Sequence, residues 1–354
     1  MTKPGEAVLV PVLSNHRFDE AALARYLSKE LPGFRGPMTV RQFQGGQSNP
    51  TFHLATPGHE YVLRKKPSGN LLASAHAVDR EFAVQRALAE SGVPVPKVHL
   101  LCTDESVIGQ MFYVMDHLDG RIFTDRLMPG SSPAERAAIY DDMNRVLAVL
   151  HGLDFRALGL SDFGRPEGYV ARQIARWSKQ YAAAKINDLP AMDRLIEWLR
   201  QHAPAEDESA ISHGDFRLGN LMIHPTEPRV IAVLDWELAT IGHPLADLAY
   251  NCLSYRLPYL EGRGFGDVDL AALGIPSEKA YVDAYCRRTG RGDAPFWEFF
   301  LVLSMFRTAA IQVGIHRRAI EGNASDARAL KIADIYTVIA DRAWQIAAGS
   351  EPPR

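Results

Sequence analysis

The spacing of apolar and polar residues in the first third of the chain predicts a small β-sheet with flanking helices. Apolar residues alternate with polar ones over several short segments, which is typical of strands that bury one face. The expected strands are Val40 to Phe43, Pro50 to Ala55, Glu60 to Arg64 and Gln110 to Met115. Helical spacing predicts helices from Asp19 to Leu31 and from Ala75 to Ser91, and Gly92 ends the second.

After Gly120 the pattern becomes mainly helical. Two segments place apolar residues on one helix face. The first set is Ile139, Met143, Val146 or Leu147, and Leu150; the second is Leu189, Met192, Ile196 and Leu199. A β-hairpin is expected over Leu221 to Ile223 and Val230 to Leu234, and helices resume from Pro244. The sequence therefore predicts an α+β fold of two lobes, residues 1–118 and 119–354.

Composition narrows the class of protein. The 354 residues are 47% hydrophobic and 23% charged, with a net charge of −3, as in ordinary globular proteins. No bulk attraction to nucleic acid or to an anionic membrane is expected, and no apolar run approaches the roughly 18 residues of a membrane span. The N-terminus lacks the pattern of a secretory signal, so we expect a cytoplasmic protein. Three distant cysteines indicate neither a disulfide framework nor a zinc site, and the oligomeric state is not indicated.

The segment from His213 to Asn220 contains the strongest chemical signal. Asp215 and Asn220 are five residues apart, and Asp235 follows fifteen residues later at the end of an apolar strand. Phosphoryl transfer from ATP needs one carboxylate that takes the proton from an attacking hydroxyl and two oxygen ligands for Mg²⁺. We therefore predict Asp215 as the catalytic base and Asn220 and Asp235 as the metal ligands.

Taken with other segments, this motif resembles the aminoglycoside phosphotransferase and choline kinase branch of the protein-kinase-like fold. The chain is most similar to bacterial phosphotransferases that resemble the kinase-like domain of some acyl-CoA dehydrogenases. The matching segments are Gly45-Gly46, Tyr61 to Pro67, Ala75 to Glu81, His213 to Asn220, Leu234 to Glu237 and Gly242 to Ala249. The resemblance implies a bilobal protein-kinase-like fold, with a β-rich nucleotide-binding lobe and a larger helical lobe, ATP and Mg²⁺ as cofactors, and a hydroxyl acceptor.

The resemblance also assigns nucleotide-binding residues. Backbone amides of Gly45, Gly46, Gln47 and Ser48 are expected to cover the phosphates. Arg64 occupies the position of the kinase strand lysine, and strand alternation favours it over Lys65, which is the second choice. Glu81 is expected to pair with that cation. The segment Met115, Asp116, His117 and Leu118 resembles the hinge where backbone groups meet adenine.

Four further residues are expected to support the site. His213 is interpreted as shaping the catalytic loop, and Asp247 as anchoring that loop through buried backbone hydrogen bonds. Glu237 is a candidate for assisting the metal through a water molecule. Arg217 has two open interpretations, which are offsetting phosphate charge and pairing with an acidic neighbour.

The identity of the acceptor is the least determined feature. Residues 245–345 contain twelve acidic and twelve basic residues, which does not favour a polycationic substrate such as an aminoglycoside. Arg307 and the His316-Arg317-Arg318 run are candidates for contacting an acid, a phosphate or a CoA group. The resemblance favours a hydroxyacyl compound or its CoA thioester. Alternatives are an aminoglycoside or amino-alcohol kinase and a nucleotide-binding regulatory module, whereas only eleven residues between Asp235 and Asp247 disfavour a protein kinase.

Overall fold

The computed structural model describes residues 8–44, 49–67, 77–205, 208–259, 262–321 and 333–349. The chain divides into two compact units. The β-rich unit comprises Met1–Phe123, Leu158–Leu160 and Asn220–Ala239, and the helical unit comprises Thr124–Ala157, Ser161–Gly219 and Thr240–Arg354. The two-lobe α+β class is confirmed, and the boundary between residues 118 and 119 stays a prediction.

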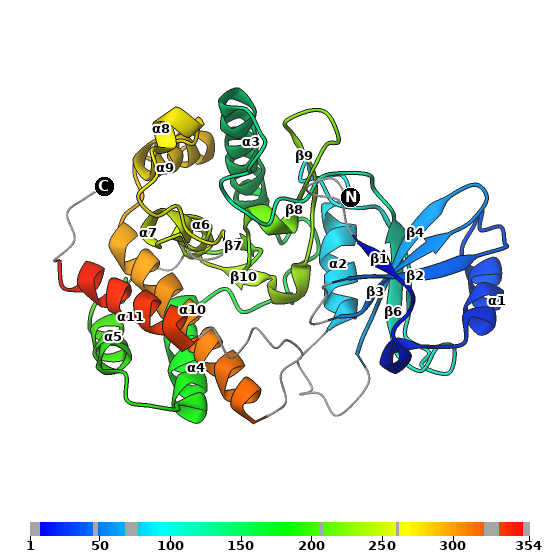
Figure 1. Cartoon of the computed structure of the whole chain (residues 1–354), viewed down its shortest axis with the longest axis horizontal. Helices are drawn as coiled ribbons and strands as arrows, with labels where there is room; N and C mark the ends of the chain where they lie inside the picture. Colours follow the sequence, from blue (N-terminus) through cyan, green and yellow to red (C-terminus); the bar gives the residue numbers. More distant parts are fainter. Residues whose placement is uncertain are drawn as a thin grey trace. The chain divides into compact units, whose positions relative to one another are not determined.

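A six-stranded antiparallel sheet forms the centre of the β-rich unit (Figure 1). Its strands lie in the order β1, β2, β3, β4, β6, β5. Their bounds are β1 Leu9–Val10, β2 Thr39–Phe43, β3 Thr51–Ala55, β4 Glu60–Lys65, β5 Val98–Cys102 and β6 Phe112–Asp116. The sequence analysis missed β1 and β5. Two strand residues are too few for a pattern, and β5 is half-buried along most of its length, so it shows no clear alternation.

Successive strand residues point to opposite faces of this sheet, so both faces are apolar enough to be covered by helices. On one face, Leu23 and Leu27 of α1 (Glu20–Glu30) pack in a core with Phe52, Leu63 and Phe112. On the other face, α2 (Val78–Leu88) packs through Val78 and Phe82 near Val62 and Tyr113. The second face is the one that also carries the chemically important side chains. A short 3₁₀ helix, η1 (Ser14–His16), precedes α1.

The hairpin of β8 (Leu221–Ile223) and β9 (Val230–Val233) also belongs to the β-rich unit. Arg121 bridges Ile223 through two backbone hydrogen bonds of 2.7 and 2.8 Å, which attach the segment after β6 to the hairpin. Gly120 makes this approach possible, because a Cβ there would lie 2.3 Å from the Met222 side chain and 2.9 Å from a backbone oxygen. The hairpin is flanked by the 3₁₀ helices η2 (Leu218–Asn220) and η3 (Trp236–Leu238).

The helical unit is built around α10 (Trp297–Ile320), which packs against α4, α5, α6 and α11. The other helices are α3 (Pro133–Gly152), α4 (Tyr169–Ala184), α5 (Pro190–Gln201), α6 (Pro244–Asn251), α7 (Leu253–Arg256), α8 (Leu270–Leu273), α9 (Glu278–Thr289) and α11 (Ala333–Ala347). A two-stranded sheet of β7 (Ala210–Ser212) and β10 (Thr240–Gly242) completes the unit. These three-residue strands were not predicted.

Two details of the helices differ from expectation. In α5 the buried residues are Ala191, Met192, Leu195 and Leu199, whereas Ile196 is only half-buried and Leu189 precedes the helix. The sequence predicts no membrane span, because its continuous apolar runs are too short. The whole of α10, however, is long and apolar enough to cross a membrane by length and composition. Its apolar window is 67% buried inside the protein, as expected for a core helix.

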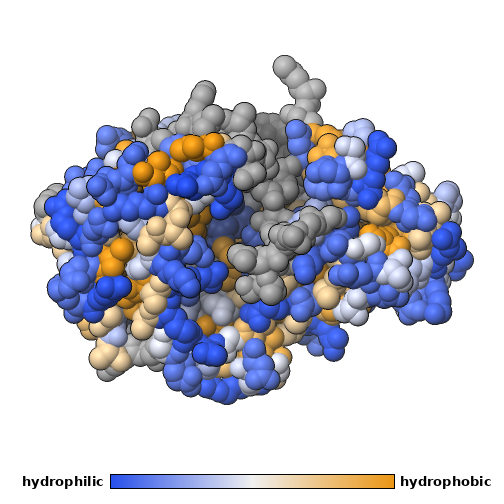
Figure 2. Space-filling model, turned by 90° about the horizontal axis from the view of Figure 1, so that it is seen from below, coloured by the Kyte–Doolittle hydropathy of each residue, from blue (hydrophilic) through white to orange (hydrophobic). Residues whose placement is uncertain are grey.

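The surface in Figure 2 shows hydrophobic residues in separate small patches among hydrophilic ones. Cys102, Cys252 and Cys286 are buried and free.

Candidate active site

Strand alternation places Arg64 and Lys65 on opposite faces of β4. Arg64 lies on the same face as Val62, and both line a cavity of about 480 Å³ in the β-rich unit. Lys65 is 3% exposed on the other face, with its ammonium 5.3 Å from the centre of the Phe18 ring. Of the two candidate cations, Arg64 is therefore the one that reaches the cavity.

Arg64 links two carboxylates from distant parts of the chain. Its Nε lies 2.7 Å from Oε2 of Glu81 on α2, and its Nη2 lies 2.7 Å from Oδ1 of Asp235. Burial disfavours the charged guanidinium, but Glu81 first, then Tyr113 and Asp235, outweigh it and raise the pKa of Arg64. Glu237 adds a smaller effect of the same sign. Arg64 is therefore a fixed cation in the cavity wall.

Glu81 is held in place by hydrogen bonds to two neighbours. It is 1% exposed and accepts hydrogen bonds from Asn49 Nδ2 at 2.6 Å and from the Tyr113 hydroxyl at 3.1 Å. Gln85, one turn along α2, donates to the same hydroxyl at 3.1 Å. Because a buried carboxylate is stable only when it is paired and hydrogen-bonded, these contacts fix the orientation of Arg64. The sequence analysis did not identify Asn49 or Tyr113.

The hairpin brings the two predicted metal ligands together. Leu221 pairs with Val233, and the backbone N–H of Leu234 donates to the carbonyl of Asn220 at 2.8 Å. Asn220 and Asp235 therefore lie at the open ends of adjacent strands. Asp235 has a φ of 66°, in the left-handed region that few non-glycine residues adopt. An amide oxygen and a carboxylate oxygen form the kind of donor set that Mg²⁺ accepts together with phosphate oxygens and water.

The predicted hinge residues form one wall of the cavity. Met115, Asp116, His117 and Leu118 all line it, together with apolar side chains that include Val62, Met222 and Leu234. The Asp116 carboxylate is turned to His99 and His59, at 2.6 and 2.9 Å. A slot with apolar walls and a fixed cation suits a planar base that carries phosphates. The predicted phosphate-covering residues Gly45, Gly46, Gln47 and Ser48 lie outside the described residues.

In the helical unit, the loop that carries Asp215 is held by one face of α6. Asp247, Tyr250 and Asn251 follow the i, i+3, i+4 spacing that places side chains on one side of a helix. Tyr250 donates to Asp215 Oδ1 at 2.5 Å, and Asn251 donates to the carbonyl of Phe216 at 3.1 Å. Gly214 has a φ of 80°, so the loop turns where a side chain would be strained.

Asp247 accepts hydrogen bonds from the backbone N–H groups of His213 and Gly214, at 2.7 and 2.9 Å. His151 on α3 lies 3.3 Å from the same carboxylate. Although burial favours the neutral acid, the contacts with His151 and His213 lower the pKa of Asp247. This is the anchoring geometry expected of Asp247, and the His213 ring accepts a hydrogen bond from the Asp215 N–H at 3.2 Å.

Two arginines complete the surroundings of this loop. Arg217 Nε lies 3.2 Å from Asp215 Oδ2, which matches the acidic-neighbour interpretation. Arg307 donates to the carbonyl of Gly214 at 2.6 Å, and its guanidinium lies over the rings of Trp177 and Tyr250. Arg307 therefore supports the loop, and contact between Arg307 and the acceptor stays a prediction. Tyr250, Asn251 and His151 were missed, although the spacing on α6 was a readable signal for the first two.

Comparison with known proteins identifies the family of the chain. A sequence model of the phosphotransferase enzyme family matches residues 39–293. The chain is 46% identical over 352 residues to acyl-CoA dehydrogenase family member 11 of Homo sapiens, covering 97% of this chain and 45% of that protein. It covers 32% of acyl-CoA dehydrogenase family member 10 of Mus musculus, at 46% identity over 95% of this chain. The chain thus spans less than half the length of these curated relatives.

Solved structures show the same fold. A structure from Ralstonia eutropha, provisionally named an aminoglycoside phosphotransferase, is 50% identical, with a TM-score of 0.87 over 94% of this chain and 99% of that chain. The aminoglycoside phosphotransferase APH(4)-Ia, solved with AMP-PNP and hygromycin B, is 17% identical, with a TM-score of 0.61 over 93% and 99% of the two chains. The second likeness shows the fold alone. The chain therefore belongs to the phosphotransferase enzyme family, and its fold is kinase-like.

Proposed function

We propose that this protein transfers a phosphoryl group from ATP, with Mg²⁺, to a hydroxyl of a small acidic molecule. The observation that carries the proposal is the position of Arg64 in the wall of a cavity, joined to Glu81 and Asp235 at 2.7 Å each. A buried cation held between two carboxylates keeps its position when the triphosphate binds. Phosphoryl transfer depends mainly on such positioning and on charge stabilisation.

Asn220 and Asp235 are the proposed metal-holding residues, because the hairpin places their oxygen-bearing side chains at the ends of adjacent strands. Bound Mg²⁺ would neutralise charge that develops on the phosphate oxygens. Arg64 adds a second positive charge from the strand. The apolar walls formed by Val62, Met115 and Leu234 exclude water from the adenine base.

Asp215 is the proposed base. Its carboxylate orients the acceptor hydroxyl and takes its proton during attack on the γ-phosphate. Hydrogen bonds from Tyr250 and Arg217 fix the two carboxylate oxygens. Asp247 accepts hydrogen bonds from the backbone N–H groups of His213 and Gly214, the two residues before Asp215, and so holds the loop itself.

The charges around the Asp215 loop support an acidic acceptor. Burial lowers the pKa of Arg126, and the nearby cations Arg217 and Arg263 lower it further. Arg126 also donates to the carbonyl of Gly262 at 3.2 Å, and a carboxylate or phosphate near these guanidinium groups would be attracted by their positive charge. A polycationic aminoglycoside would add to the repulsion. A hydroxyacyl compound or its CoA thioester fits this charge and agrees with the acyl-CoA dehydrogenase names of the longer relatives.

Two candidates of the His316-Arg317-Arg318 run, His316 and Arg317, have other partners. His316 lies 3.2 Å from the Tyr336 hydroxyl, and Arg317 pairs with Glu321 at 2.6 Å. We therefore assign the acceptor's acidic group to Arg126 and Arg263, with Arg217 beside the base. The oriented carboxylate of Asp215 disfavours the regulatory-module alternative, because a module that only binds nucleotide does not need one.

The test is Mg-ATP-dependent ADP release with five acceptor pools: hydroxyacyl-CoAs, free hydroxy acids, sugars, amino alcohols and aminoglycosides. Asp215→Ala protein provides the blank for ATP hydrolysis unrelated to transfer. The proposal predicts a signal in an acidic pool that is lost in the variant and reduced by Arg126→Gln. A signal only in the aminoglycoside or amino-alcohol pool would refute the acidic acceptor and retain the kinase. Nucleotide binding without transfer to any pool would favour the regulatory module.

A further inference from the structure

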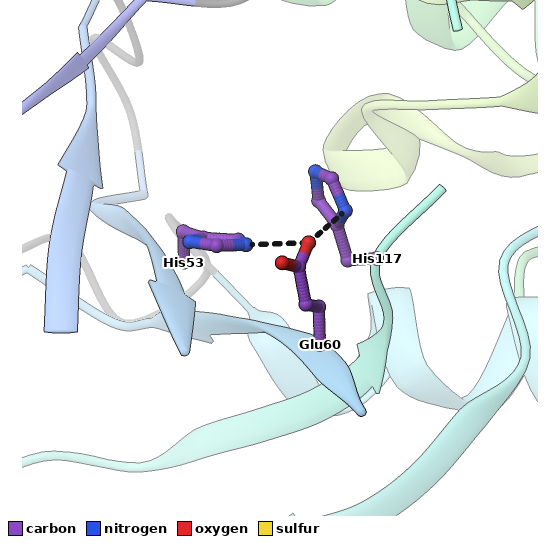
Figure 3. Close-up of side chains that lie close together, drawn as sticks. All are labelled: His53, Glu60 and His117. Carbon is purple, nitrogen blue, oxygen red and sulfur yellow. Dashed lines mark hydrogen bonds and ion pairs between the residues drawn. The ribbon is translucent and has the colours of Figure 1, made fainter. Parts of the chain in front are cut away.

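A cluster of two imidazoles and one carboxylate lies beside the cavity, and these three side chains have no assigned role in the proposed transfer. We call His53, Glu60 and His117 the first triad. Figure 3 shows both imidazoles directed at the Glu60 carboxylate from different sides. His53 comes from β3, Glu60 begins β4, and His117 follows β6, so three neighbouring segments of one sheet contribute one ligand group each.

The donor atoms of the first triad have the spacing of metal ligands. His53 Nε2 and His117 Nδ1 each lie 3.1 Å from Glu60 Oε2, and the three atoms lie within 4.8 Å of one another. Ligands at about 2.0–2.1 Å from a tetrahedral ion are about 3.3 Å apart, so a small adjustment accommodates Zn²⁺. Two imidazoles and a carboxylate form a donor set that Zn²⁺ accepts and that Mg²⁺ does not prefer.

The surroundings leave room for a fourth ligand. His117 lines the 480 Å³ cavity, so water or a ligand in the cavity has access to an ion bound there. The Phe43 ring stacks on His117 and meets His53 edge-on, with ring centres 6.3 and 6.1 Å apart, which shields one side of the triad. The His53 side chain is only 10% exposed, so its orientation is fixed by packing.

A second triad of His59, His99 and Asp116 has the same composition but fits an ion less well. Both imidazoles contact the same oxygen, Asp116 Oδ1, at 2.9 and 2.6 Å. A separation of 2.6 Å is that of a short charge-assisted hydrogen bond and is too small for two ligands of one ion. Exposure does not separate the two triads, because the His59 side chain is 49% exposed and that of Glu60 in the first triad is 52% exposed.

We infer that the first triad is a Zn²⁺ site at the hinge edge of the nucleotide cavity, separate from the magnesium ligands Asn220 and Asp235. A bound ion would link β3 and β4 to the His117 segment that forms one cavity wall. The consequence is a Zn²⁺-dependent stabilisation of the β-rich unit. The site rests on the geometry of the triad and stands or falls independently of the transfer reaction.

The test is Zn²⁺ titration of the untagged, chelator-treated full chain, without nucleotide and with millimolar Mg²⁺ present. We expect one Zn²⁺ per chain, a rise in Tm on binding, and visible Co²⁺ bands of a four-coordinate site. Glu60→Gln retains the size of the side chain and should weaken Zn²⁺ binding at least tenfold, as should His117→Gln. His99→Gln, in the second triad, is the matched control and should bind as the unaltered protein does.

Two outcomes would overturn the inference. One is the absence of Zn²⁺ binding tighter than about 0.1 mM in the unaltered protein, since such weak binding is common for exposed imidazoles. The other is binding that persists in Glu60→Gln and His117→Gln but disappears in His99→Gln, because it would place the ion at the second triad. Circular dichroism of each variant shows that lost binding does not reflect lost folding.

Discussion

The hydroxyl of Tyr250 donates a hydrogen bond of 2.5 Å to Oδ1 of Asp215. Tyr250 lies on α6, three residues after the Asp247 that binds the backbone of the same loop. One helix thus fixes both the position of the loop and the orientation of its carboxylate. Burial and the neighbouring Asp215 raise the pKa of Tyr250, so the hydroxyl remains a donor throughout the physiological pH range.

Replacing Tyr250 with Phe removes this hydrogen bond while preserving the ring that packs under Arg307. Because a hydrogen bond to a charged group contributes about 1.5–3 kcal/mol, we expect kcat to fall about 10- to 100-fold, with little change in the KM for ATP. Steady-state kinetics with an accepted substrate measures both. An unchanged kcat would show that Asp215 does not depend on this contact.

Replacing Arg64 with Ala should weaken ATP binding by about 10- to 100-fold, because it removes a charge-assisted contact from the cavity wall. Lys65→Met is the matched control. Lys65 is buried over the Phe18 ring on the opposite sheet face, and burial lowers the pKa of its ammonium. The Lys65→Met variant should therefore retain the nucleotide affinity of the unaltered protein. Calorimetric titration with AMP-PNP compares the affinities of the two variants. Weaker binding in Lys65→Met than in Arg64→Ala would assign the phosphate contact to Lys65.

Replacing Asp247 with Ala leaves two buried backbone N–H groups without their acceptor. We expect a loss of about 2–5 kcal/mol in the free energy of unfolding, measured by urea denaturation with circular dichroism. Asp247→Asn keeps one acceptor oxygen and should lose less. A loss below about 1 kcal/mol for Asp247→Ala would show that the carboxylate is not needed to hold the loop.

The stability that Asp247 provides should also depend on pH. Its folded pKa is lowered from the model-compound value of 3.8, so its charge stabilises the folded state above that pH. The contribution declines as the pH falls below about 3.8 and through the folded pKa. The difference in unfolding free energy between the unaltered protein and Asp247→Asn should therefore be constant near neutral pH and shrink in acid. A difference that grows as the pH falls would contradict this sign.

Replacing Gly120 with Ala should distort the cavity wall, because the new Cβ would lie 2.3 Å from Met222, which lines the cavity. We expect a loss of about 1–3 kcal/mol in stability and weaker nucleotide binding. Gly58→Ala is the matched control, since no atom lies within 4 Å of its Cβ position. Thermal unfolding with and without AMP-PNP distinguishes the two variants, and equal effects would exclude the steric explanation.

Local sequence patterns predicted the parts of the fold that have a strong period. Strands β3, β4 and β6 alternate between two covered faces, and this alternation also separated Arg64 from Lys65. The three-residue strands β7 and β10 are too short to show a period, and their pairing of Ser212 with Thr240 joins residues far apart in sequence. Such pairing depends on the assembled unit.

In the candidate site, too, the local sequence predicted some residues, and contacts between distant segments determine the others. Asp215, Asn220 and Asp235 are candidates because their spacing is the one that phosphoryl transfer requires. Their partners were missed where the contact joins distant segments, as between Asn49 and Glu81, 32 residues apart. Tyr250 is 35 residues from Asp215 and has no motif of its own. Its place on the same face of α6 as Asp247 was the available signal.

The most direct test of the account is single-turnover transfer from γ-labelled ATP to an acidic hydroxyl acceptor, in the unaltered protein and in Asp215→Asn. Nucleotide affinity is measured in parallel with AMP-PNP and Mg²⁺. The account predicts labelled product from the unaltered protein, a loss of at least about 1,000-fold in rate for the variant, and nucleotide affinity within about threefold. Equal transfer rates in the two proteins would contradict the role of Asp215 as the base.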